Sequence, residues 1–304
     1  MGTWEWMAKW MSDVYSNDQL RQSAQVAGNR LPVAEQAWKQ FCLIPINFLE
    51  TPRGQIDYEV HRSLGAFLMY HWDAGHTAGL SLGNALSGHY NVAFTLLRSF
   101  MELVLNGALF QCLAQRRFRE SPSQALEPID SLRMLITHLS TTVREEGIDD
   151  SELESNSIAI FNILRGDWMQ YAFHLSTGSI IQQLADWGVF NHLGDNSVNI
   201  VKSLYFELSR SVHERVEYTD AGRAIEEGKE IFEWPAPILA QSLSEVLNHF
   251  HLAMEIGIIM LLNMLAGYIS PDRLHQKCQQ LLSSEAFKLA DLKQATKLLK
   301  RWSM

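Results

Sequence analysis

The most apolar stretch of the chain, residues 91–110, carries a narrow line of polar side chains. Asn91, Thr95, Arg98, Glu102 and Asn106 follow one another at steps of four, three, four and four residues. Those steps place them on one face of an α-helix, with phenylalanine, leucine, valine and methionine around the rest. A charge among apolar side chains needs a polar partner. The pattern therefore predicts a buried helix with one polar seam, in which Arg98 and Glu102 form a candidate site.

Two later helices repeat this pattern. In SLYFELSRSVHERVEY, the residues Tyr205, Ser209 and His213 lie four apart, and Arg210 lies beside them. The third seam, in PILAQSLSEVLNHFHLAMEIG, follows steps of four, three and four and consists of Ser244, Asn248, His251 and Glu255. Facing side chains at the centre of a bundle often build a site, so we expect the three seams to converge. The alternative is a polar network that only fixes the register of the helices.

Helical periodicity extends along the whole chain. Apolar positions recur at spacings of three and four, and no run of alternating β-branched residues lies between turns. We therefore predict an all-α fold, a helical bundle with N- and C-terminal helical additions. The longer predicted helices cover about 56–86, 89–115, 122–146, 196–216 and 237–268, with short ones up to 27, after 32, within 151–187 and after 270. We divide the chain into an N-terminal extension (1–50), a main bundle (51–270) and C-terminal helices (271–304), which form one compact unit.

The composition is that of a globular protein, since 47% of the 304 residues are hydrophobic and 19% are charged. The cysteines, Cys42, Cys112 and Cys278, are odd in number and widely spaced. They predict neither a disulfide framework nor a zinc site. No secretory signal is visible, because charges occur throughout the first residues. These features predict a cytoplasmic protein with reduced thiols.

Two segments raise the question of a membrane. Residues 252–269 approach the length of a spanning helix, but Glu255 and Asn263 interrupt them. A bilayer tolerates an internal carboxylate poorly, whereas a bundle core accepts one that has a partner. The stripe that contains Trp4 and Trp10 lacks the cationic opposite face of an interfacial helix. We expect no membrane insertion, and we expect this stripe to dock on the core or on a second copy.

Motifs for several common kinds of chemistry are absent from the sequence. The formal net charge of −9 argues against non-specific coating of nucleic acid, although a local basic cleft is compatible with it. Glu245/His249 and His251/Glu255 point in different directions on their helix, and Glu-x-x-His is missing. There is no Gly-x-Ser-x-Gly at a turn from a strand to a helix, no phosphate-cradling loop and no dinucleotide fingerprint after a strand. We expect neither a metal nor a cofactor.

The run LLRSFMELVLNGALF, followed by YFELSRSVHERVEY, resembles a group of uncharacterised bacterial helical proteins with L-R-x-x-x-E and Y-x-x-L-S-x-x-V-H motifs. More distantly, residues 56–268 are similar to the HEPN superfamily. That resemblance implies a HEPN-like core, dimerisation and a role in toxin-antitoxin, abortive-infection or CRISPR-associated systems. Active HEPN ribonucleases carry an Arg and a His separated by about four to six residues. In this chain only two residues separate Arg210 from His213.

Metal-independent RNA cleavage needs a group that transfers the proton of the 2′-hydroxyl and a cation that holds the phosphate. His213 is the candidate acid or base. Arg210 and Arg98 are candidate phosphate clamps, Glu102 would orient one of these groups, and Tyr205 would contact a base or a phosphate. The first hypothesis is therefore a HEPN-like protein that acts on or binds RNA in bacterial defence; as an enzyme it would be a metal-independent ribonuclease. The second is a non-catalytic helical scaffold or regulatory subunit that binds a protein partner or a second copy.

Overall fold

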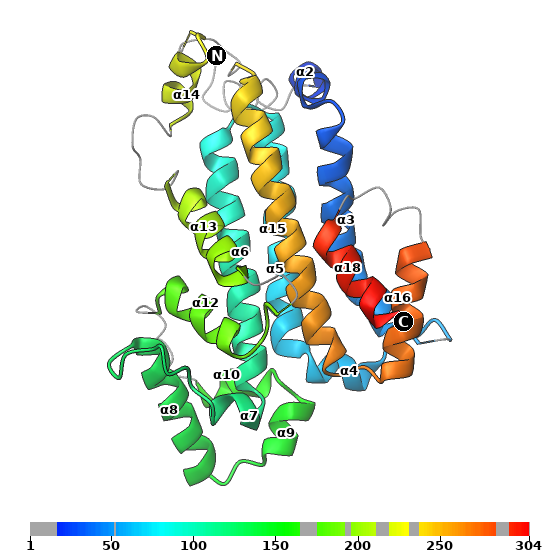
Figure 1. Ribbon diagram of the computed structural model, residues 1–304, viewed down its shortest axis with the longest axis vertical. Coiled ribbons are helices and arrows are strands. Elements are labelled where there is room, and N and C mark those ends of the chain that lie inside the picture. The colour runs from blue at the N-terminus through cyan, green and yellow to red at the C-terminus, as the bar shows by residue number, and fades with distance from the viewer. Residues whose placement is uncertain are drawn as a thin grey trace, which may run out of the picture.

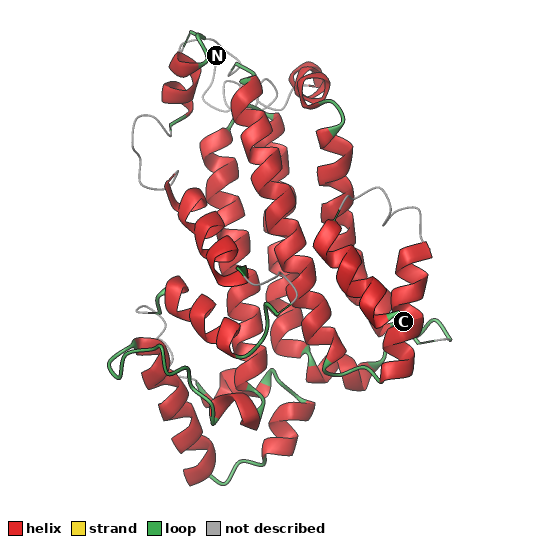
Figure 2. Cartoon of the chain, in the orientation of Figure 1, coloured by secondary structure: helices red, strands yellow, loops and turns green. Residues whose placement is uncertain are grey.

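A computed structural model of the chain describes residues 17–51, 53–164, 175–191, 196–210, 219–230, 237–283 and 292–303. Four long helices form its centre (Figure 1): α3 (Arg30–Leu49), α5 (Gly65–Leu86), α6 (Tyr90–Leu113) and α15 (Ala240–Ala266). Each of them packs against at least two of the others. Within the described ranges there is no strand, only an isolated β-bridge between Glu50 and Ile56 (Figure 2). The prediction of an all-α helical bundle is confirmed.

Shorter helices surround the four central ones. α12 (Thr177–Asp186) and α13 (Ser197–Arg210) pack on α6, and α16 (Pro271–Ser283) packs with α18 (Lys293–Trp302) beside α3 and α15. Two helices lie at the upper end of the bundle in Figure 1: α2 (Asn17–Ala27) and α14 (Asp220–Glu226). The helices at the lower end are α4 (Tyr58–Ser63), α7 (Arg116–Arg119), α8 (Ser131–Glu145), α9 (Asp150–Ser155) and α10 (Ala159–Ile163). Large apolar side chains on two of the central helices remain exposed, among them Ile46 of α3 and Trp72 of α5.

α5 and α6 form an antiparallel hairpin. The turn between them contains Gly88 at φ 80°, a left-handed conformation that glycine adopts without a steric penalty. Further along α6, Gly107 allows close approach, because a Cβ there would lie 2.8 Å from the Cβ of Tyr70 and 3.3 Å from the carbonyl oxygen of Phe67. The turn at Gly88 confirms the helix break predicted at Ser87-Gly88.

Other predicted boundaries were wrong. The single helix predicted over 56–86 is two helices, α4 and α5, with Leu64 between them. The short helix predicted after Pro32 is the 20-residue α3, which continues through Pro45. The helix predicted from residue 122 begins only at Ser131, where the side chain of Asp130 accepts from the amide of Leu132 and caps α8.

Two central helices begin against carboxylates from residues 219–230. The amide of Asn91 in α6 donates to Asp220 at 2.8 Å, and the amide of Ser242 in α15 donates to Glu227 at 2.9 Å. Amides in the first turn of a helix have no partner within the helix, and the helix dipole favours an anion there. Residues 219–230 therefore hold the upper ends of α6 and α15 together.

α6 and α15 are long and apolar enough to cross a membrane. Within the bundle, 56% of the most apolar part of α6 and 72% of that of α15 are buried. Core helices of a bundle have this length, composition and burial as well. The absence of membrane insertion and the cytoplasmic location stay predictions.

Candidate functional site

Two of the three predicted seams meet where α13 packs on α6. Arg98 donates to the Tyr205 hydroxyl from Nη2 at 3.0 Å and from Nε at 3.2 Å, and this hydroxyl donates to Glu102 Oε1 at 2.6 Å. Arg98 Nη2 also lies 2.9 Å from Glu102 Oε1. The predicted juxtaposition of Arg98, Glu102 and Tyr205 is confirmed, while their role in RNA chemistry stays a prediction.

This polar cluster is partly open to solvent. The side chain of Arg98 is 27% exposed and that of Glu102 is 33% exposed. A fourth member joins them, because Thr177 at the start of α12 donates to the Tyr205 hydroxyl at 3.1 Å. Burial lowers the pKa of Arg98, but the hydrogen bond to Tyr205 and the charge of Glu102 outweigh burial and raise it. Arg98 is thus a permanent cation at the edge of solvent.

A groove of about 600 Å³ runs beside the cluster, where α12 and α13 pack together. We call it the polar groove; its lining residues are Arg98, Gly178, Ile181, Lys202, Ser203, Tyr205, Phe206 and Ser209. Two of these residues are cations and none is a carboxylate. In a chain with a net charge of −9, the polar groove is therefore a locally cationic surface.

The other candidates on this helix lie around the groove. Ser209 lines it, and its hydroxyl donates to the carbonyl oxygen of Tyr205 at 2.7 Å. Arg210 is exposed, and its guanidinium lies 5.0 Å from the centre of the Phe206 ring rather than in the cluster. His213, the predicted acid or base, lies outside the described residues.

The third seam does not join the other two, so the predicted convergence of all three was wrong. Ser244 accepts a hydrogen bond from Arg30 of α3, and Asn248 is exposed. Glu255, which is buried, accepts from the backbone amide of Gln294 at 2.6 Å and so caps the start of α18. This seam faces α3 and α18, on a different side of α15 from α13.

His251 belongs to the same seam. It is half-buried, and its Nδ1 is buried without a hydrogen-bond partner among the described residues. A different face of α15 meets α13 and α14: His249 Nε2 lies 3.2 Å from Glu207, and Glu245 accepts from Arg223 at 2.8 Å. The helical period predicted which residues share a face, but not which neighbour each face contacts.

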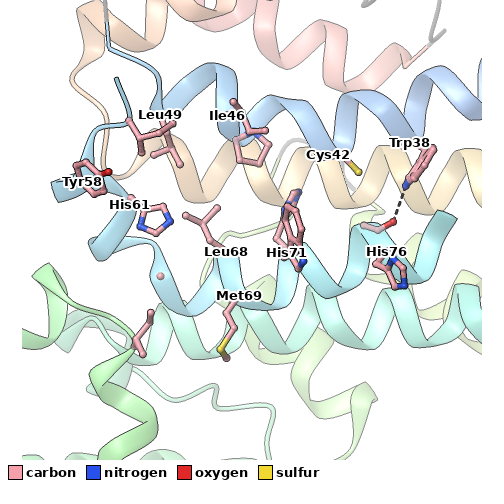
Figure 3. Close-up of a pocket in the computed structure, with 16 residues that line it drawn as sticks. Trp38, Cys42, Ile46, Leu49, Tyr58, His61, Leu68, Met69, His71 and His76 are labelled. Atoms are coloured by element: carbon pink, nitrogen blue, oxygen red, sulfur yellow. Dashed lines mark hydrogen bonds between the residues drawn. The ribbon is translucent and has the colours of Figure 1, made fainter. Parts of the chain in front are cut away.

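A second groove lies elsewhere in the described part of the chain, between α3, α4 and α5, and sequence reasoning missed it. We call it the apolar groove; its volume is about 710 Å³. Figure 3 shows Trp38, Cys42, Ile46 and Leu49 of α3 along one wall, facing Leu68 and other side chains of α5. The remaining lining residues are Pro45, Ile56, Tyr58, His61, Gly65, Met69, His71, Trp72, Gly75, His76 and Ile158. Neither a carboxylate nor a lysine or arginine lines it.

A proline shapes the floor of the apolar groove. Pro45 has no backbone N–H, so the carbonyl of Phe41, four residues earlier in α3, lacks its helical partner. His71 of α5 lies against this carbonyl instead, with Nε2 2.9 Å from the oxygen, and its ring stacks on that of Phe41. Burial lowers the pKa of His71 to about 4, against the weaker effect of this hydrogen bond. His71 is therefore neutral at physiological pH and donates from Nε2.

Glycines bring α3 close to α5 at the other end of the groove. The indole Nε1 of Trp38 donates to the carbonyl of Gly75 at 2.8 Å (Figure 3). The ring lies over Gly79, where a Cβ would be 2.7 Å from Cζ2 of Trp38. The missing side chains of Gly75 and Gly79 thus allow α3 to pack closely against α5. The sequence did contain a signal for the apolar groove, because α3 has more apolar residues than one buried face requires. Leu43 and Ile46 lie outside the buried face of α3 and are exposed.

The described residues offer little for nucleophilic or metal chemistry. Burial raises the pKa of Cys42 to about 11 and that of Cys112 to about 12, so both remain thiols at neutral pH. No three His, Cys, Asp or Glu side chains gather in the described part of the chain to hold a metal ion.

The chain was compared with protein-family models, curated proteins and solved structures, and none of them matches it.

Proposed function

We propose that this protein is a non-catalytic helical scaffold that binds a protein partner through the apolar groove. The observation that supports this most directly is the exposure of large apolar side chains at the rim of the groove. Trp72 is 78% exposed, Tyr58 74% and Ile46 49%. Exposed apolar patches with aromatic residues and methionine are typical of protein interfaces, where tryptophan and tyrosine often contribute most of the affinity.

The proposed partner element is an amphipathic helix. The α3 wall of the groove runs from Trp38 to Leu49, which is about 16 Å of helix or three turns. A helix that lies in a groove between two others presents apolar residues at i, i+3 or i+4 and i+7 over that length. Leu43 on α3 and Leu80 on α5 are also exposed. The apolar surface thus extends beyond the lining of the hollow, which favours a macromolecule over an enclosed small ligand.

The chemistry of the groove fits recognition rather than catalysis. Its inner polar groups are already paired within the protein, as the indole of Trp38 and the imidazole of His71 show. The thiol of Cys42 is protonated at neutral pH. Affinity would therefore come from burial of apolar surface around a few large side chains.

The test is selection of helix-length peptides from a displayed random library on the full-length protein. Enriched sequences are expected to carry apolar residues with helical spacing, and Trp72→Ala should weaken their binding by about thirtyfold, which corresponds to about 2 kcal/mol. The control is Ile129→Ala, which also removes an exposed apolar side chain but outside the groove. Peptides without helical periodicity, or equal affinity for Trp72→Ala, would contradict the proposal.

Sedimentation of the same proteins tests whether the partner is a second copy of the chain. A dimer that Trp72→Ala dissociates and Ile129→Ala leaves intact would assign the groove to self-association. A monomer at all concentrations leaves a different protein as the partner.

The ribonuclease hypothesis stays a prediction. The polar groove supports its phosphate clamp, because Arg98 faces solvent there beside Lys202. Its acid or base, His213, lies outside the described residues. Cleavage of RNA by the purified protein, abolished in a folded His213→Ala variant, would establish it over the scaffold function.

A further inference from the structure

The polar groove has the charge pattern of an anion site. Arg98 uses Nε and Nη2 for Tyr205 and Glu102, and its Nη1 makes no hydrogen bond to the described residues. The carboxylate of Glu102 is paired with Arg98 and Tyr205 and does not line the groove. Lys202 adds a second cation from α13, where its Nζ donates to Gln182 at 3.1 Å and keeps two further protons.

Neutral donors complete this end of the groove. Gly178, in the first turn of the ten-residue α12, lines it and has no side chain to cover its amide. First-turn amides have no partner within the helix, and the helix dipole is positive there. Ser203 lines the same space with an exposed hydroxyl. Two cations, a helix start and a hydroxyl around one hollow suit the several oxygens of a phosphate group.

An exposed aromatic ring lies next to these donors. Phe206 lines the groove, yet it is 61% exposed. The guanidinium of Arg210 lies 5.0 Å from the centre of the ring, and the exposed surface of the ring offers a face to a planar group. Aromatic side chains that bind nucleotides provide such a face for the base.

We propose that the polar groove binds a nucleotide, with its phosphate held by Arg98 and Lys202 and its base stacked on Phe206. This site is separate from the apolar groove and does not depend on the proposed scaffold function. The nucleotide is either free or part of a single-stranded RNA, and both present the same phosphate and base to these residues.

The test is titration calorimetry of the full-length protein with inorganic phosphate and with adenosine 5′-monophosphate. The mononucleotide should bind more tightly than phosphate. Lys202→Gln should weaken both ligands about tenfold, because it removes one charge-assisted contact. Phe206→Ala should weaken the mononucleotide about tenfold and leave phosphate unchanged. Lys39→Gln is the matched control, since it removes an exposed lysine on α3.

Three outcomes would overturn the proposal. They are equal binding of phosphate and mononucleotide, wild-type affinity in Lys202→Gln, and an equal loss in Lys39→Gln. Circular dichroism of each variant checks the fold, and Phe206→Ala alters an exposed side chain, so it remains informative if Lys202→Gln unfolds. A single-stranded RNA that binds more tightly than the mononucleotide, with a steep salt dependence, identifies a strand as the source. Equal affinities identify a free nucleotide.

Discussion

The pairing of His71 with the carbonyl of Phe41 makes the stability of this protein depend on one buried imidazole. Pro45 removes the helical donor to that carbonyl, and His71 Nε2 replaces it at 2.9 Å. His71→Leu would leave a buried carbonyl unsatisfied, which costs about 1–3 kcal/mol. In a Pro45→Ala background, the new amide of residue 45 can donate to the same carbonyl. His71→Leu should then cost about 1–2 kcal/mol less.

The same pair predicts a pH dependence. The pKa of His71 is about 4 in the folded protein, and an unfolded histidine titrates near 6.5. Between these values the unfolded chain binds a proton that the folded protein does not, so the free energy of unfolding falls as pH falls. The difference between the two pKa values corresponds to about 3 kcal/mol of stability, which is lost as the pH falls from about 6.5 to about 4. His71→Leu lacks this contribution.

The assay is urea unfolding of the wild type, both single variants and the double variant, monitored by circular dichroism at several pH values. Subtracting the free energy of unfolding of His71→Leu from that of the wild type at each pH cancels the effect of the carboxylates that titrate in the same range. The reasoning fails if this difference does not change with pH, or if the double-variant cycle gives a coupling below about 0.5 kcal/mol.

Two further predictions concern packing and capping. Gly79→Ala places a Cβ 2.7 Å from the ring of Trp38 and should cost about 1–3 kcal/mol in urea unfolding, whereas Gly83→Ala meets nothing within 4 Å and should not destabilise; equal stability of the two variants would contradict the packing argument. Glu255→Ala removes the acceptor at the start of α18 and should cost about 1–2 kcal/mol, with faster hydrogen exchange of α18 amides and unchanged exchange in α6. Glu255→Gln retains an oxygen acceptor and should lose less, so identical exchange in all three proteins would argue against the cap.

The polar cluster shows how far the sequence could predict the candidate site. Helical spacing placed Arg98 one turn from Glu102 and required a polar partner for both, and the hydroxyl of Tyr205 meets that requirement. The same reasoning required a partner for Glu255. That partner is a backbone amide 39 residues away, at Gln294, and a backbone group has no signature in a residue pattern.

The apolar groove was beyond prediction for a different reason. Periodicity shows that a helix has an apolar face, but not whether another helix covers it. α3 carries apolar residues on its buried stripe and also at Leu43 and Ile46, and only the arrangement of α3 and α5 shows that these stay uncovered. The role of His71 required the structure as well, because it depends on a carbonyl freed by a proline in another helix.

The acceptors at the helix starts have a consequence for how this chain folds. The first turn is the costly step of helix formation. In α5 and α6, the acceptors for the first-turn amides are side chains far away in the sequence. The amide of Ala66 in α5 donates to Ser157, 91 residues away, and that of Asn91 in α6 donates to Asp220, 129 residues away. The excised α5 or α6 would therefore be a poor helix as a peptide. Contacts between such distant segments slow folding, and we expect the central helices to form together in one cooperative, comparatively slow step.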